Sequence, residues 1–143
     1  MNKDVSIRIT GVHGRGEDRD TVVSEYRGLY FEKNSKKYIK YSETDNESGE
    51  VRNSMIVLEG RNVTVEHKGS TDAKMIYEIG KTTRSMYVTP AGSMILEIFT
   101  RGIDIEERDN RISLTIDYDM GFGDGEKQPA RIIIDAREKK SDD

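Results

Sequence analysis

Apolar and polar residues alternate with a period of two along most of the chain. The clearest case is the segment 111–120, in which the apolar and aromatic residues occupy the even positions and mostly polar ones the odd positions. This is the pattern of a β-strand with one buried and one wet face. No comparable stretch has the 3.6-residue period of an amphipathic helix. The pattern therefore predicts an all-β protein.

Ten segments are expected to form strands, with turn residues between them. They are Val5–Val12, Thr21–Glu32, Tyr38–Glu43, Val51–Glu59, Asn62–Lys68, Ala73–Ile79, Thr82–Val88, Ser93–Ile105, Arg111–Met120 and Arg131–Arg137. Gly28 predicts a bulge or a sharp bend inside the second strand. The segment Ser93–Ile105 has apolar residues of both parities, which indicates either that both faces are covered or that the strand bends between two environments.

The connections between these strands are too short for parallel crossovers, so the strands should pair antiparallel. An open sheet of this size curls or closes to remove its edges. The expected fold is a closed antiparallel β-barrel of about eight to ten strands in a single domain, residues 1–137, followed by a frayed tail, residues 138–143. The interior of such a barrel is either filled by side chains or holds one small ligand.

The composition excludes several kinds of site and partner. The chain of 143 residues has no cysteine, which excludes disulfides, thiolate nucleophiles and Cys-ligated metals. Its net charge of −4 disfavours nucleic acid as a partner. The N-terminal residues lack the apolar core of a signal peptide, and no apolar run approaches membrane-spanning length. We expect a cytoplasmic protein without a membrane partner.

The motifs that suggest catalysis or metal binding lack the residues that such sites need. The segment Asp117–Gln128 resembles a calcium loop, but it lacks the side-chain oxygen, glycine and glutamate that the EF-hand needs at its fifth, sixth and twelfth positions. His13 and His67 are isolated, have no ligand spacing, and are expected at the surface or rim. The sequence predicts no catalytic residue, no metal site and no cofactor.

Tyrosines are the more informative residue type. Five of them fall on the parity assigned to the interior: Tyr26, Tyr30, Tyr41, Tyr87 and Tyr118. Glu43 follows Tyr41 on the same face. Tyrosine buries a large ring but must satisfy its hydroxyl, so these side chains either cap a packed core or line a pocket. Both interpretations stay open.

Several motifs together resemble the YwiB-like proteins, a family of small cytoplasmic proteins of Firmicutes classed as a domain of unknown function. The resemblance covers roughly Val5 to Arg137 and rests on Gly28-x-Tyr30, Tyr38-Ile39-Lys40-Tyr41-Ser42-Glu43, Gly49-Glu50-Val51, Tyr87-Val88-Thr89-Pro90-Ala91-Gly92 with the following Met94-x-Leu96-x-Ile98-x-Thr100, and Ile116-Asp117-Tyr118-Asp119-Met120. It implies a calycin-like, lipocalin-type β-barrel. It implies no activity.

Three hypotheses follow. The first is a non-enzymatic module that binds a small, partly apolar molecule inside the barrel among Tyr41, Glu43, Tyr87 and Tyr118. The alternative is a surface-mediated interaction or regulatory protein with a filled barrel, including a homodimer through an edge strand; Ile95 and Phe99, if exposed, would mark that surface. The third is an enzyme, for which Glu43 would be the best catalytic carboxylate.

Overall fold

A computed structural model describes residues 3–14, 16–123 and 125–139. Within these ranges the chain forms ten strands and one short 3-10 helix, η1 (Gly16–Asp18). The strands are β1 (Lys3–His13), β2 (Asp20–Lys33), β3 (Lys36–Thr44), β4 (Val51–Glu59), β5 (Asn62–Gly69), β6 (Ala73–Tyr77), β7 (Thr82–Thr89), β8 (Gly92–Arg108), β9 (Arg111–Phe122) and β10 (Gln128–Glu138).

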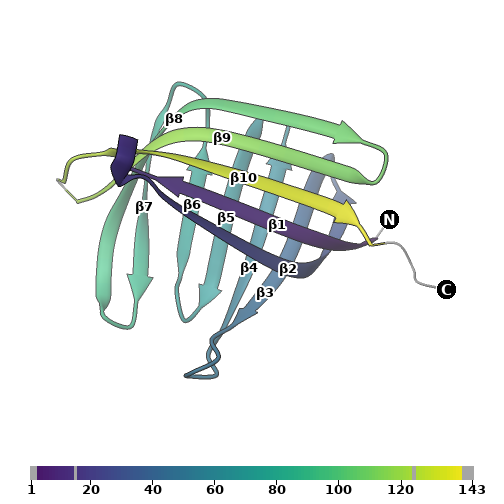
Figure 1. Cartoon of the computed structure of the whole chain (residues 1–143), viewed down its shortest axis with the longest axis horizontal. Helices are drawn as coiled ribbons and strands as arrows, with labels where there is room; N and C mark the ends of the chain where they lie inside the picture. The colour runs from purple at the N-terminus through teal and green to yellow at the C-terminus, as the bar shows by residue number, and fades with distance from the viewer. Residues whose placement is uncertain (1–2, 15, 124, 140–143) are drawn as a thin grey trace.

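The ten strands form one sheet in the order β6-β5-β4-β3-β2-β1-β10-β9-β8-β7, and all neighbouring pairs are antiparallel. The sheet curls so that β9, β10 and β1 lie in front of β3, β4 and β5 (Figure 1). The outer strands β6 and β7 come together where Val88 of β7 exchanges backbone hydrogen bonds of 2.9 and 2.8 Å with Asp72, the residue before β6. The result is a nearly closed antiparallel barrel, as the sequence predicts.

The mixed parity of the eighth predicted strand has a local cause. Leu96, Ile98 and Thr100 are buried at even positions, whereas Ile103 is buried at an odd position. The pairing of β8 with β9 shifts between Thr100 and Gly102, so an irregularity of the β-bulge type moves the inward face from one parity to the other. The strand therefore bends between two environments.

Side chains that point into the barrel form one continuous core. Buried residues alternate with partly exposed ones in β4, where Ser54, Ile56 and Leu58 point inward. The fully buried apolar side chains come from both halves of the sheet: Ile7, Ile39, Ile56, Val63, Tyr77, Leu96, Ile98, Leu114, Ile116 and Ile134. Apolar burial of this kind is the main force that holds a cysteine-free barrel together.

Gly28 marks the place where β2 parts from β3. Pairing between the two strands begins at Gly28 and Tyr41, so the preceding half of β2 is hydrogen-bonded to β1 alone. A Cβ at Gly28 would lie 2.2 Å from the carbonyl oxygen of Lys40, a distance that no side chain tolerates. Pairing with β1 runs through Gly28 without a bulge. The absence of a side chain at Gly28 thus lets β2 and β3 approach closely at the point where the two strands separate.

The two ends of the barrel differ. Lys37 of β3 and Glu107 of β8 form an ion pair, although their strands are not neighbours in the sheet, and this pair spans the end at which the N- and C-termini lie (Figure 1). The opposite end carries η1 and the β9–β10 connection. Glu138 belongs to β10, and Lys139 donates a backbone hydrogen bond to Asp4; the rest of the predicted frayed tail, residues 140–143, lies outside the described residues.

Across the described ranges, no helix has the length and apolar character needed to cross a bilayer.

Candidate functional site: a cavity inside the barrel

A cavity of about 280 Å³ lies inside the barrel, toward the end opposite the termini. Its walls come from β1 to β6, β9 and β10, and combine apolar, aromatic and polar side chains. The apolar part is formed by Ile9, Val22, Ile56, Val65, Met75, Ile132 and Ile134. The volume has room for about nine water molecules. The barrel is therefore not completely filled by its own side chains.

A polar cluster lies on one wall of the cavity. Glu43 of β3 and Arg52 of β4 are direct cross-strand neighbours, and Arg52 Nε donates a hydrogen bond to Glu43 Oε2. The hydroxyl of Tyr26 on β2 donates a hydrogen bond to Glu43 Oε1. Their side chains are only partly exposed, 21% for Glu43 and 28% for Arg52. The two charges balance, so this wall is polar but carries no net charge.

His67 lies beside that cluster. Its Nδ1 is hydrogen-bonded to Ser54 Oγ at 2.7 Å, and Ser54 is itself buried. Burial, and then the positive charge of Arg52, lowers the pKa of His67 to about 4. His67 is consequently neutral at physiological pH and offers an uncharged imidazole to the cavity.

Four tyrosines form two aromatic pairs in the lining. Tyr26 stacks on Tyr41 with 4.6 Å between ring centroids, and Tyr77 meets Tyr118 edge to face at 5.1 Å. Burial raises the pKa of Tyr41 to about 12 and also raises the pKa of Tyr77 and Tyr118. All these hydroxyls therefore stay protonated at neutral pH and can donate hydrogen bonds.

Comparison with known proteins places this barrel in a family. The model of DUF1934, a domain of unknown function, matches residues 7–134. The chain belongs to the DUF1934 family. It is 31% identical over 122 residues to the "Uncharacterized beta-barrel protein YwiB" of Bacillus subtilis (strain 168), which covers 82% of this chain and 83% of YwiB. The crystal structure of ywiB protein from Bacillus subtilis superposes with a TM-score of 0.85 and 18% identity, over 97% of this chain and 94% of that one.

These matches confirm the predicted YwiB-like resemblance and the β-barrel fold. They imply no activity or ligand for this DUF1934 chain, because the family is one of unknown function and YwiB is itself an uncharacterised β-barrel protein. Function has to be argued from the site itself.

The structure brings three of the four predicted site residues together. Tyr41, Glu43 and Tyr118 all line the cavity. Tyr87 lies apart from them: it is half-buried on β7 and packs edge to face on Phe122, with ring centroids 5.6 Å apart. Tyr87 shares the inward parity, but it does not line the cavity.

Sequence reasoning missed much of the lining; the missed residues with the most informative side chains are Arg52, His67 and Tyr77. Each shares the parity of buried neighbours on its own strand, as Arg52 does with Ser54 and His67 with Val65. That signal was available. For Arg52 and His67 it was obscured because ionisable residues near strand ends are usually solvated.

Among the residues that the structure describes, no three acidic, histidine or cysteine side chains converge in a way that could hold a metal ion. His13 and His67 both line the cavity, and His13 is exposed at its edge.

Proposed function

We propose that this DUF1934 protein binds a small, partly apolar molecule inside the barrel, without catalysing a reaction on it. The observation that supports this most directly is the cavity of about 280 Å³ with apolar walls and a few convergent polar groups. Small-molecule sites typically combine such walls with a small number of fixed donors and acceptors.

The chemistry of the walls favours a ligand without net charge. Glu43 neutralises Arg52, and His67 is uncharged at neutral pH. A charged ligand would have to leave water without a free counter-charge, which is costly. The tyrosine pairs supply flat aromatic surface, and the hydroxyls of Tyr41 and Tyr118 add polar atoms. A planar molecule with one or two polar substituents fits this arrangement best.

Blocking the cavity tests the proposal. Val22 lines the cavity and is 59% exposed, so Val22→Trp should obstruct its edge without disturbing the buried core. A metabolite library is screened by thermal shift on the parent protein, where a ligand at about 100 times its Kd should raise the melting temperature by about 5–10 °C. Val22→Trp should abolish that shift.

Val23→Trp is the matched control. Val23 is the next residue on the same strand and is 57% exposed, but it points to the outer face and is not part of the lining. This variant should keep the full ligand-induced shift. Equal shifts in both tryptophan variants, or no stabilising compound for the parent protein, would contradict the proposal.

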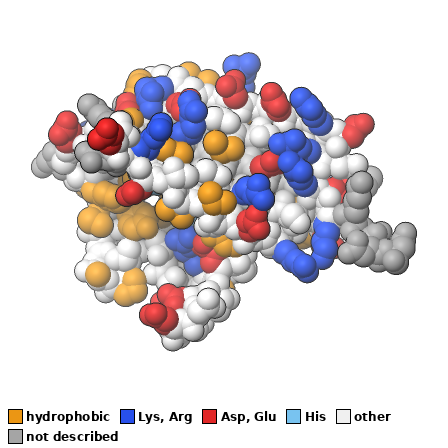
Figure 2. Space-filling model, viewed as in Figure 1, with side chains coloured by type: hydrophobic (Ala, Val, Ile, Leu, Met, Phe, Trp, Pro, Cys, Tyr) orange, Lys and Arg blue, Asp and Glu red, His pale blue; other side chains and the backbone are white. Residues whose placement is uncertain are grey.

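A second candidate function rests on the outer face of the β7–β8 hairpin. Met86 and Ile95 are directly opposite each other there and are 54% and 50% exposed, whereas Phe99 is half-buried. Figure 2 shows apolar side chains gathered at the end of the barrel where β7 and β8 lie. We propose a second copy of the chain as the partner in this case, packed on the outer face of the β7–β8 hairpin. Light scattering tests it: a dimer that Ile95→Asp converts to a monomer supports it, and a monomeric parent protein contradicts it.

A further inference from the structure

Arginines gather on the outer face of the barrel, away from the cavity. Cross-strand pairing places Arg111, Arg137, Ser6 and Arg27 in one row across β9, β10, β1 and β2. Arg8 follows Ser6 on the same face of β1. Figure 2 shows Lys and Arg side chains over this side of the molecule, where β10, β1 and β2 run in Figure 1. Like charges in adjacent positions repel one another, so this arrangement requires an explanation.

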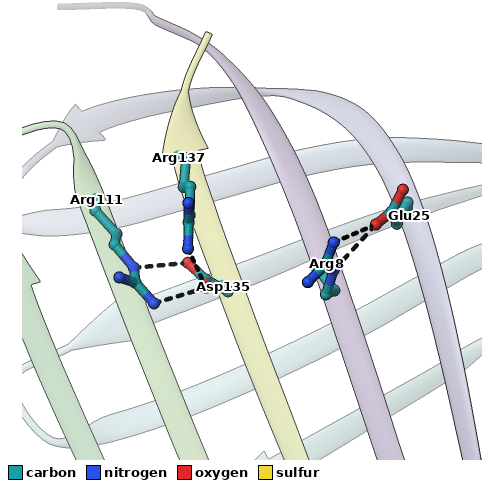
Figure 3. Close-up of polar contacts among 5 residues, drawn as sticks. All are labelled: Arg8, Glu25, Arg111, Asp135 and Arg137. Carbon is teal, nitrogen blue, oxygen red and sulfur yellow. Dashed lines mark hydrogen bonds and ion pairs between the residues drawn. The ribbon is translucent and has the colours of Figure 1, made fainter.

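Asp135 balances part of the positive charge of this arginine row. Its two carboxylate oxygens accept hydrogen bonds of 3.0 and 2.9 Å from Arg111, and Arg137 lies 3.6 Å from the same carboxylate (Figure 3). The side chain of Asp135 is only 18% exposed, so the Arg111–Asp135 pair is partly shielded from water. Arg137 is 62% exposed and makes only a long contact, which leaves its guanidinium able to bind another anion.

Arg8 and Arg27 are also able to bind another anion. Arg8 pairs with Glu25, but both side chains are largely exposed, at 63% and 65%, and such pairs contribute little stability. Figure 3 shows this pair on the neighbouring strands β1 and β2. Arg27 is exposed and has no ion pair within the part of the chain that the structure describes.

The small side chain of Ser6 leaves a hollow between these arginines. Its volume is about 410 Å³; its lining includes the charged side chains of Arg8, Glu25, Arg27, Asp135 and Arg137 beside Ser6, together with Ile7 and Tyr26. With Arg111, four guanidinium groups face two carboxylates, a local charge of +2 on a chain whose net charge is −4. Asp4 and Lys40 border the next hollow beyond Arg27, and their charges offset each other.

We propose that this hollow binds a doubly charged phosphoryl group of a small molecule. Arg27 and Arg137 stand on either side of Ser6 and can each donate to a phosphoryl oxygen, while Ser6 Oγ donates from the floor. Arginine forks match phosphate geometry, and hydrogen bonds between charged partners are the strong ones. The site is independent of the cavity ligand and goes beyond it.

A long polyanion fits this face less well. Outside the hollow, Arg131 of β10 and Arg101 of β8 are engaged by Asp117 and Asp119 of β9, which would repel a chain of phosphates. The positive charge is thus confined to one hollow, the size of a single small ligand.

The test is an NMR titration of the ¹⁵N-labelled full chain with two probes, inorganic phosphate and methyl phosphate, at constant ionic strength maintained with chloride. Saturable shifts are expected at the backbone amides of Ser6, Arg27 and Arg137. Arg27→Gln should weaken binding about tenfold or more, because one charge-assisted contact is lost. Arg131→Gln, which removes an arginine from the same face but outside the hollow, should leave the affinity unchanged.

The two probes distinguish the source of the phosphoryl group. Tighter binding of methyl phosphate indicates a phosphate monoester, and equal or tighter binding of inorganic phosphate indicates the free ion; either supports the site. Shifts that never saturate, or an equal loss of affinity in Arg27→Gln and Arg131→Gln, would overturn it. Because the probes do not involve the cavity, Val22→Trp should bind phosphate as the parent protein does.

Discussion

Glu43 and Arg52 stand opposite each other on neighbouring strands and form a partly buried ion pair in the wall of the barrel cavity. The tyrosine of a third strand, Tyr26, donates a hydrogen bond to the same carboxylate. Polar groups with little exposure are retained when each has a partner, and here each partner comes from a different strand. The pair therefore fixes the geometry of the wall that a ligand would meet.

Replacing Glu43 by Gln should lower the free energy of unfolding by about 1–3 kcal/mol, because Arg52 loses its counter-charge in a partly desolvated place. Urea denaturation measures the change. Glu25→Gln is the control, since it breaks an exposed pair with Arg8 and should alter stability by less than about 0.5 kcal/mol. Equal losses in the two variants would show that burial of the Glu43 pair is energetically irrelevant.

His67 should make stability depend on pH in a defined window. Its pKa is about 4 in the folded chain and near 6.5 when exposed, so between these values the unfolded chain binds a proton that the folded chain does not. The stabilisation is complete above about pH 6.5 and declines by up to about 3 kcal/mol as the pH falls to about 4. NMR titration of the His67 ring gives the folded pKa directly.

His67→Gln should flatten the stability profile between pH 4 and 6.5. If the variant retained the full slope, other groups would be responsible, and a His67 ring that titrates near pH 6.5 would contradict the buried, neutral state.

Gly28→Ala should destabilise the barrel by about 1–3 kcal/mol or more, because the new Cβ would lie 2.2 Å from the Lys40 carbonyl oxygen and 2.6 Å from Ile7 Cδ1. Gly102→Ala is a matched glycine substitution on β8, where nothing lies within 4 Å of the added carbon. Thermal unfolding of the two variants should therefore differ by several degrees. Similar melting temperatures would mean that β2 and β3 do not approach closely at Gly28.

Thr100→Val should be neutral or stabilising by about 1 kcal/mol. The Thr100 hydroxyl is buried and lacks a hydrogen-bond partner in the described part of the chain, and valine replaces it with an apolar group of similar shape. Thr83→Val should have the opposite sign, since Thr83 Oγ1 donates a 2.7 Å hydrogen bond to the carbonyl of Ile76. Chemical denaturation of both variants checks the sign of each change.

Sequence periodicity was enough to predict the strands, because a period of two follows directly from which face of a strand is buried, and the short connections were enough to predict antiparallel pairing. It also placed Tyr41 and Tyr118 on the inward face. It did not reveal the ion pair of Lys37 with Glu107, since the two residues come from strands that meet only across the barrel end. Periodicity also did not show that Tyr87 lies away from the cavity, because parity fixes the face of a side chain but not its height along the barrel.

The central claim, a ligand inside the barrel, is tested most directly by isoleucine-methyl NMR. Compounds that raise the melting temperature are titrated into the labelled protein. The predicted result is saturable shifts of the cavity methyls of Ile9, Ile56, Ile132 and Ile134, with Ile95 and Ile133 of the outer face unmoved. Shifts confined to Ile95 or Ile133, or none at the cavity methyls, would contradict it.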